Sequence, residues 1–464
     1  MKLVLVALIA TAQLLVNQPD LQADDVVKPV KPAETKLSQK PVWLTELSIG
    51  IKESFDDNIF LAGAPVLSSY TVPAGSVAAV KNISSFVTTI SPKIGVDFVP
   101  LLGNQGALQS LTLSYAPDFV FYHEASSENY DNHRVIVSTK GKMDDFSFQM
   151  ENVFNYINGS DYGAIYPGNY RSVYSYAPSR ERREQLQNRN TVTFRYDQEK
   201  WFVRPTSSLL YYDLDTVQLA GVTGYQNYAD RYDVNGGADL GYKLNKDLAV
   251  TVGYRYGFQY QQTFSSAIDL YNQSADNVYQ RALLGIEGKP FNWLEIKIQG
   301  GPDFRRYAHS ALVRDQSPTT YYGEAVITAT ITKQDTITFN YRQWQWIAST
   351  GCVPYFDSTY DLNYSHKFND KLSGNLGLRL LGADYTSDLT YNNTAHTPAT
   401  ACTYFRNDLE YTISAGVRYA FNAHLSAELS YAHDLGRNAI DGLANPDYRE
   451  FDHQLFSIGL QTKF

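Results

Sequence analysis

The sequence predicts an all-β protein, a transmembrane antiparallel β-barrel of about eighteen strands. Three observations lead to this fold class. Apolar and polar residues alternate strictly over many short segments, tyrosine and phenylalanine are abundant, and short breaks alternate with long ones along the chain. A barrel strand that crosses a membrane turns one face to lipid and the other to water, so its side chains alternate with a period of two.

The stretch VTVGYRYGFQY, residues 250–260, shows the alternation clearly. Its even positions hold Val, Val, Tyr, Tyr, Phe and Tyr, and its odd positions hold Thr, Gly, Arg, Gly and Gln. A tyrosine ring is apolar but its hydroxyl is best solvated, so tyrosines collect where a bilayer meets water. We therefore expect the even face of this strand to contact membrane lipid.

The composition agrees with a barrel and excludes two other classes. The 464 residues include 36 Tyr, 23 Phe, 3 Met and 2 Cys, with a mean hydropathy of -0.32. Beyond the N-terminus no apolar run is long enough for a membrane-spanning helix, which excludes a helical membrane protein. The net charge of -9 argues against nucleic acid as a partner.

The N-terminal segment resembles a bacterial secretion signal. Residues 1–23 begin with Lys2, continue with an apolar stretch too short to span a bilayer and end on a small residue, Ala23. An uncleaved anchor is the alternative. Residues 24–42 combine lysine and proline without periodicity and are expected to be a disordered periplasmic lead-in, and residues 43–464 form the barrel. This order predicts the outer membrane of a Gram-negative bacterium.

The breaks define the strands. Short breaks such as Asn245 to Asp247 and Lys333 to Asp335 are expected to be periplasmic turns, and long breaks such as Asn158 to Gln187 and Gly436 to Glu450 outer loops. Two segments, Trp201 to Asp213 and Thr336 to Trp346, fit either register. If the weak first two strands are discounted, the count falls to sixteen. The eighteen strands are expected to start near Trp43, Ile83, Gln109, Asn132, Phe146, Asn188, Trp201, Asp230, Leu248, Asn277, Trp293, Thr320, Thr336, Tyr355, Leu372, Phe405, His424 and Phe451.

The chain ends on a strand with a terminal aromatic residue, QLFSIGLQTKF. This ending resembles the C-terminal signature of outer-membrane barrels, which implies that the barrel-assembly machinery is a partner and that Phe464 is its assembly signal. Thr462 departs from the signature, which more often has an aromatic residue there.

Short motifs near the N-terminus resemble the β-barrel porin-2 family, which includes outer-membrane proteins from exopolysaccharide operons. The motifs are Asp57-Asn58-Ile59-Phe60 at the end of the first strand and Ser91-Pro92 in the second, followed later by VTVGYRYGFQY and NVYQRALLGIEGK. The resemblance implies an outer-membrane barrel over the whole mature chain and leaves its solute open.

A barrel of sixteen to eighteen strands has an aqueous lumen, so the inward side chains are the candidate functional residues. Charged groups on the lipid face cost on the order of 2 to 4 kcal/mol for Arg or Lys near the midplane, which favours the lumen. Alternatively, these charges only solvate the wall and pair across strands. The alternation assigns to the lumen Arg195, Arg255, Arg281, Arg379, Arg418, Lys93, Lys243, Lys297, Asp97, Asp118, Glu151, Asp239, Glu295, Glu410 and Glu428.

One long break is rich in tyrosine and arginine. Tyrosine rings stack on the apolar faces of sugars, and arginine hydrogen-bonds hydroxyls and acidic groups. A loop folded inward as a saccharide track is one interpretation, and an outer loop packed on itself is the other. The candidate saccharide contacts are Tyr162, Tyr166, Tyr170, Tyr174, Arg182 and Arg183.

Metal, cofactor and enzyme sites are not predicted. Asp56, Asp57 and Asn58 are oxygen donors suited to calcium, but the same residues form common turns. His433 and Asp434 are adjacent, so on a strand they point to opposite faces and do not form a lipase dyad.

The sequence thus predicts a non-enzymatic outer-membrane channel, in contact with lipid, for small hydrophilic solutes or for polysaccharide export or uptake. A surface-exposed adhesive or structural barrel is the alternative, followed by an outer-membrane lipase or protease. Cys352 and Cys402, the two cysteines of the chain, fall in consecutive outer loops and are expected to form a disulfide in the oxidising compartment, the alternative being two free thiols.

Overall fold

The computed structural model describes most of the barrel. The described residues are 40–59, 61, 83–103, 106–159, 184–214, 230–262, 274–308, 315–347, 354–388, 404–440 and 451–464. The expected signal peptide and most of the expected lead-in lie outside them. None of the described helical residues forms a segment of the length and hydropathy that a membrane-spanning helix requires.

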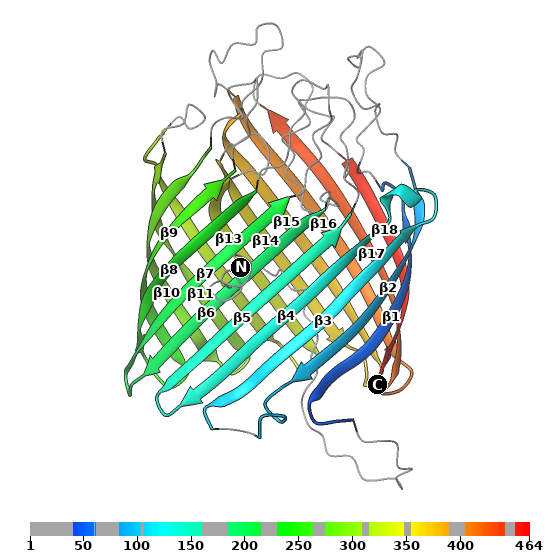
Figure 1. The fold of residues 1–464 in the computed structure, drawn as a ribbon, viewed down its shortest axis with the longest axis horizontal. Helices are drawn as coiled ribbons and strands as arrows, with labels where there is room; N and C mark the ends of the chain where they lie inside the picture. Colours follow the sequence, from blue (N-terminus) through cyan, green and yellow to red (C-terminus); the bar gives the residue numbers. More distant parts are fainter. Residues whose placement is uncertain are drawn as a thin grey trace, which may run out of the picture.

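Eighteen antiparallel strands form one closed sheet (Figure 1). Each strand pairs with its neighbours in the chain, and β1 closes the barrel by pairing with β18, where Phe55 lies opposite Phe456. The strands are β1 Leu44–Asp56, β2 Ser85–Asp97, β3 Leu108–Tyr122, β4 Tyr130–Met143, β5 Phe146–Asn158, β6 Gln185–Asp197, β7 Trp201–Leu214, β8 Arg231–Lys243, β9 Leu248–Gln261, β10 Asn277–Phe291, β11 Leu294–Tyr307, β12 Thr319–Thr330, β13 Asp335–Ile347, β14 Pro354–Lys367, β15 Leu372–Asp388, β16 Tyr404–Ala420, β17 Leu425–Ile440 and β18 Phe451–Lys463, with one 3₁₀ turn, η2, at Ser126–Glu128.

The barrel and its strand number confirm the predicted fold class, and sixteen strands is wrong. The start positions agree closely, with the largest difference at β6, which begins at Gln185 instead of Asn188. One expected break was placed too early: β17 continues to Ile440, because Gly436 still pairs with Phe451 of β18 and with Glu410 of β16. Glycine there allows a close contact, since a Cβ on Gly436 would lie 2.1 Å from the Phe451 ring.

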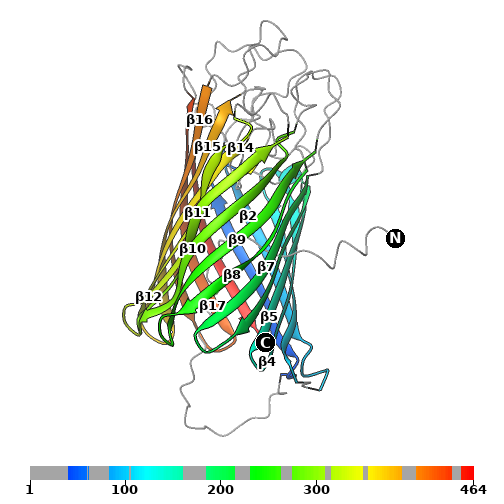
Figure 2. The same cartoon turned by 90° about the vertical axis from the view of Figure 1, so that its left-hand side faces the viewer.

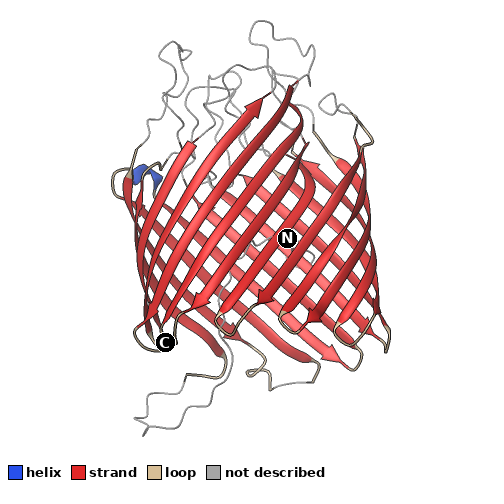
Figure 3. Ribbon diagram, turned by 180° about the vertical axis from the view of Figure 1, so that it is seen from behind, coloured by secondary structure: helices blue, strands red, loops and turns tan. Residues whose placement is uncertain are grey.

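The connections sort by length to the two rims of the barrel. The short turns gather at one end, where the chain also terminates, as Figures 1 and 3 show. The β8–β9 turn is held by Asn245, whose side-chain oxygen accepts a 2.8 Å hydrogen bond from the backbone N–H of Asp247. We call this end the short-turn rim and the opposite end the long-connection rim.

The outer face of the barrel is apolar. In β9, Val252, Tyr254 and Tyr256 are exposed while the residues between them are buried, so the alternation read from the sequence corresponds to two faces. Aliphatic side chains such as Leu284, Ile413 and Ile458 lie midway along their tilted strands (Figure 2). Exposed aromatic side chains gather near both strand ends: Trp201, Phe291, Trp293 and Phe421 at the short-turn rim, and Phe55, Phe86, Tyr260 and Tyr321 at the other. An aliphatic band between two aromatic belts is the surface that a bilayer requires.

Three asparagines interrupt this outer face. Asn152 of β5 donates from Nδ2 to the side-chain oxygens of Asn188 (3.1 Å) and Asn190 (2.7 Å) on β6. Their register places them on the face that carries Phe154 and Phe194. Mutual hydrogen bonding partly satisfies amides that would otherwise be costly against lipid.

Candidate functional site: a charged cavity inside the barrel

A cavity of about 680 Å³ lies inside the barrel, lined by inward side chains from β3 through β14. The two faces of each strand follow from the ladder, because directly paired residues point to the same side of an antiparallel sheet. Arg255 of β9 pairs with Arg281 of β10, and both line the cavity. The inner face is therefore the one that carries the odd-numbered residues of β9.

One wall of the cavity is a clamp of carboxylates and guanidinium groups. Arg204 of β7 lies between Asp239 of β8, at 3.0 Å, and Glu287 of β10, at 2.8 Å. Arg195 of β6 pairs with Asp197 at 2.7 Å and stacks on the Phe202 ring, 3.6 Å from its centroid. Each guanidinium is fixed by two or more contacts, so this wall presents positive charge in a defined geometry.

Neighbouring strands hold this wall in place through the register. Arg204 is paired directly with Asp239 across β7 and β8, so the ion pair forms between cross-strand neighbours. Arg255 and Arg281 also lie directly opposite one another, which brings two like charges together. Asp239 offsets this repulsion by pairing with Arg255 at 2.7 Å, and Asp303 does so by pairing with Arg281 at 2.8 Å.

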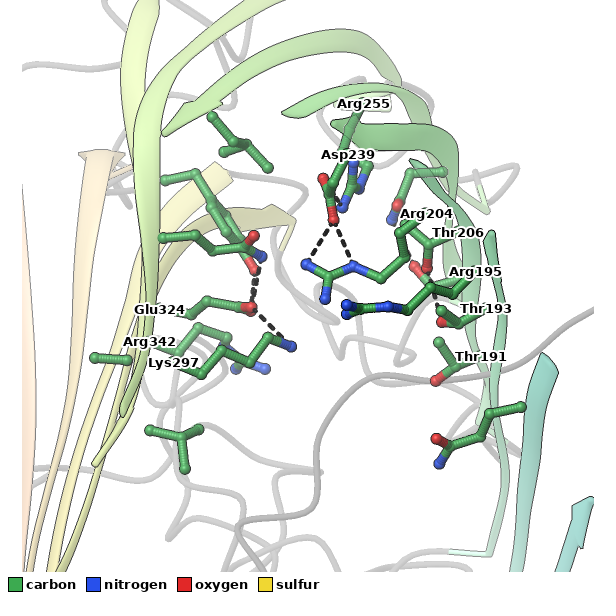
Figure 4. Close-up of a pocket in the computed structure, with 18 of the residues that line it drawn as sticks. Thr191, Thr193, Arg195, Arg204, Thr206, Asp239, Arg255, Lys297, Glu324 and Arg342 are labelled. Carbon is green, nitrogen blue, oxygen red and sulfur yellow. Dashed lines mark hydrogen bonds and ion pairs between the residues drawn. The ribbon is translucent and has the colours of Figure 1, made fainter. Parts of the chain in front are cut away.

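The opposite wall carries Lys297 of β11, Glu324 of β12 and Arg342 of β13. Their contacts are longer: Lys297 Nζ lies 3.9 Å from Glu324, and Arg342 Nη2 lies 3.7 Å from Asp357. Figure 4 shows Lys297 and Glu324 facing Arg195 and Arg204 across the cavity. The lysine side chain is 54% exposed, so it remains available to a solute in the cavity.

Toward the long-connection rim, the inner face becomes a packed polar network. Asp303 is fully buried and accepts hydrogen bonds from Arg281 (2.8 Å) and Arg305 (2.9 Å). Arg305 also donates to Gln259, and the Tyr279 hydroxyl donates to Asp233 at 2.9 Å. Buried polar groups need such partners, because an unpaired one loses its hydration without compensation.

The last residues of β13, near the long-connection rim, contact this network through their backbone oxygens. Gln259 of β9 donates to the backbone oxygen of Gln345 at 3.0 Å, and Arg231 of β8 donates to that of Ile347 at 2.6 Å. β13 is not a ladder neighbour of β8 or β9. Trp344 and Trp346 are buried here and stack with centroids 4.6 Å apart. Because β13 contacts strands that are not its neighbours in the sheet, it narrows the interior of the barrel near the long-connection rim.

The structure places all the charged residues predicted for the lumen on the inner face, but it does not bring them together in one site. Arg195, Arg255, Arg281, Lys297 and Asp239 line the cavity, and Lys243 pairs with Asp197 beside it. The others follow the inner face elsewhere, as the ladders of β2–β5, β11 and β14–β18 show: Lys93, Asp97, Asp118, Glu151, Glu295, Arg379, Glu410, Arg418 and Glu428.

Several of these side chains pair across strands. Arg379 pairs with Asp361 at 2.9 Å, and Lys93 pairs with Glu46 at 2.9 Å. Glu295 pairs with Lys289 at 3.3 Å, close to the short-turn rim. These pairs fit the interpretation that many inner charges solvate and connect the wall.

Other predicted residues fall outside the described part of the chain. These are the tyrosine and arginine candidates for saccharide contact from Tyr162 to Arg183 and the cysteines Cys352 and Cys402. Phe464 is described: its N–H donates to the Leu47 oxygen at 2.9 Å and its side chain is 64% exposed.

Sequence reasoning missed several charged residues of this region. Arg204 and Arg342 lie in the two segments whose register was ambiguous, so their faces were not assigned. Cross-strand charge pairing would have resolved the ambiguous register of β7, since only one register puts Arg204 beside Asp239. Also missed were Glu287, Asp303 and Arg305, which share strand faces with predicted residues, and Glu324, which pairs with Gln299 on the same face of β11 as Lys297.

The candidate calcium residues belong to a contact at the barrel closure. Oxygen and nitrogen atoms of Asp56, Asp57 and His453 lie within 4.8 Å of one another. His453 contacts Asp56 at 3.1 Å and Asp434 at 2.9 Å, which ties β1, β17 and β18 together. Asp56 also accepts the backbone N–H of Asn58 at 2.9 Å, as in an Asx turn.

Comparison with known proteins gives only distant likenesses. No protein-family model and no curated protein matches this chain. Pseudomonas aeruginosa OpdK, solved with vanillate, is 11% identical with a TM-score of 0.40, and the match covers 90% of this chain and 98% of that one. Acinetobacter baumannii OccAB3 is 11% identical with a TM-score of 0.40, and the match covers 90% of this chain and 99% of that one. The FrpB iron transporter from Neisseria meningitidis is 8% identical with a TM-score of 0.41, and the match covers 90% of this chain and 82% of that one. Likeness at this level supports no statement about the ligand or activity of this chain.

Proposed function

We propose that this protein is a channel of the bacterial outer membrane through which small hydrophilic solutes cross. The observation that carries the proposal is a polar, charged cavity of about 680 Å³ inside a closed barrel whose outer face is apolar. Fixed charges lining an interior are favourable where ion-pair partners, water or polar solutes surround them. A barrel of this size encloses space that side chains alone do not fill.

Small solutes fit the described interior better than a polysaccharide does. The cavity is lined mainly by guanidinium, ammonium, hydroxyl and amide groups. Of its two tyrosines, Tyr322 is only 5% exposed, and Tyr341 lies on the face of β13 opposite to that of Arg342. Stacking on sugar faces needs exposed aromatic rings. Polysaccharide passage and the adhesive alternative both depend on the long connections, which lie largely outside the described residues.

Single-channel recording in planar lipid bilayers tests the proposal. We expect discrete, steady current steps when the folded barrel is added, and none from detergent buffer alone. Folded barrel is identified beforehand by its heat-modifiable migration on gels. Folded barrel that inserts but passes no current would contradict the channel, and release of fatty acids from the bilayer lipid would instead support the enzyme.

A further inference from the structure

We infer that the cavity selects small anionic solutes, such as carboxylates and other oxyanions. This inference rests on the proposed channel function and adds the class of solute. It is carried by the charge of the cavity lining, by the direction in which its cations point and by the weak pairing of two of them.

The lining is strongly cationic. Seven cationic side chains line the cavity, against two carboxylates, Asp239 and Glu324. When the ion-pair partners of these groups within the described residues are included, the network holds nine cations and six carboxylates. Among the described residues this network thus has three more cations than carboxylates, although the whole chain has a net charge of -9. The seven lining cations are Lys140, Arg195, Arg204, Arg255, Arg281, Lys297 and Arg342.

Like charges face each other across the cavity. Arg195 and Arg204 on one wall are directed toward Lys297 on the other, as Figure 4 shows. Ion pairs with Asp197, Asp239 and Glu287 hold the two arginines in place, so they do not turn away from the lysine. A negatively charged solute between the two walls lowers the electrostatic energy of the cations on both of them. The low dielectric constant of the protein walls strengthens this attraction.

Two of the lining cations, Lys140 and Lys297, are weakly paired. No described residue forms an ion pair or hydrogen bond with Lys140, whose side chain is exposed on the inner face. Lys297 has only the long contact to Glu324. Their charge is less neutralised than that of the clamped arginines. We assign these two side chains the main contact with the anion.

Reversal potentials in a KCl gradient test the inference with a matched pair of variants. The test variant is Lys140→Glu with Lys297→Glu. The control, Lys246→Glu with Lys333→Glu, makes the same charge change on exposed lysines of two short turns. We expect the unmodified protein and the control to favour chloride, and the test variant to lose or invert that preference. Succinate should reduce the chloride current of the unmodified protein and the control more than that of the test variant, and glycerol should affect all three alike.

The outcomes separate the two proposals. Absence of current from folded protein would contradict the channel function itself. A current without anion preference, or a preference that survives in the test variant, would leave the channel intact and overturn the anion assignment. If the test variant gives too little heat-modifiable barrel, Lys140→Gln with Lys297→Gln replaces it, and the chloride preference should then be weakened.

Discussion

Asp303 shows how a single buried carboxylate determines the arrangement of its surroundings. It is fully buried on the inner face of β11 and is the counter-ion of both Arg281 and Arg305. Both guanidinium groups also lie against the Tyr279 ring, at 4.2 and 4.8 Å from its centroid. The carboxylate therefore holds two cations against the same tyrosine ring.

Substitution of Asp303→Asn should destabilise the barrel strongly. Removing one partner of a buried ion pair leaves uncompensated charge and costs about 3–5 kcal/mol. We expect a lower urea midpoint for unfolding in lipid vesicles. Asp247→Asn in the β8–β9 turn is the control, because its contact with Lys246 is exposed and such pairs contribute about 0–1 kcal/mol. Equal midpoints for the two variants would show that the Asp303 network does not stabilise the fold.

Phe464 is predicted to act in assembly. Its backbone hydrogen-bonds to Leu47 and its ring is exposed at the short-turn rim, away from the cavity. Phe464→Ala should lower the amount of heat-modifiable barrel in membranes and leave the conductance of the barrels that do assemble unchanged. An unchanged yield would refute the assembly signal, and a changed conductance would place the residue on the solute path.

At the scale of elements, β13 is the strand whose behaviour differs most from the regular pattern. Its first residues follow the ladder with β12 and β14, but its last residues also contact β8 and β9 across the barrel. These contacts use backbone oxygens near the strand end as acceptors. The narrowing of the barrel therefore depends on two donors, Arg231 and Gln259.

Replacing both donors should widen the barrel near the long-connection rim. We expect Arg231→Ala with Gln259→Ala to increase the single-channel conductance, because β13 loses its cross-barrel hydrogen bonds. Arg306→Ala, on the exposed outer face of β11, is the control and should leave the conductance unchanged. If the double variant folds and conducts like the unmodified protein, β13 does not limit the current.

Much of the fold could be predicted from the sequence, because the signals that specify strands and turns are local in the chain. Alternation in segments such as residues 250–260 reports the two faces of a strand, and breaks such as Asn245 to Asp247 report the turns. The position of Arg255 and Arg281 on the inner face could be predicted directly from this alternation. The contact of Gln259 with Gln345 did not, because it joins residues 86 positions apart on strands that are not paired neighbours. The clamp around Arg204 was missed for a related reason: its register depends on Asp239 in the next strand.

At the scale of the whole molecule, the proposed channel function requires a polar path through the inside of a membrane-spanning cylinder. The apolar outer face with its aromatic belts fixes how the barrel lies in a bilayer, and the inner face supplies fixed charge. Both features arise from the same alternation, so one residue step along a strand moves a side chain from lipid to water. Thr193 and Phe194 of β6 are such a pair: Thr193 lines the cavity, and Phe194 is 40% exposed on the outer face.

Current recording during cysteine modification at these two positions is the most direct test of a solute path along the inner face. Thr193→Cys and Phe194→Cys are made in a background in which Cys352 and Cys402 are serine, and a charged, membrane-impermeant methanethiosulfonate reagent is added. We predict that the reagent irreversibly lowers the current through the Thr193→Cys barrel and leaves the Phe194→Cys barrel unaffected. A current that responds at Phe194 and not at Thr193, or at neither position, would contradict a solute path along the inner face.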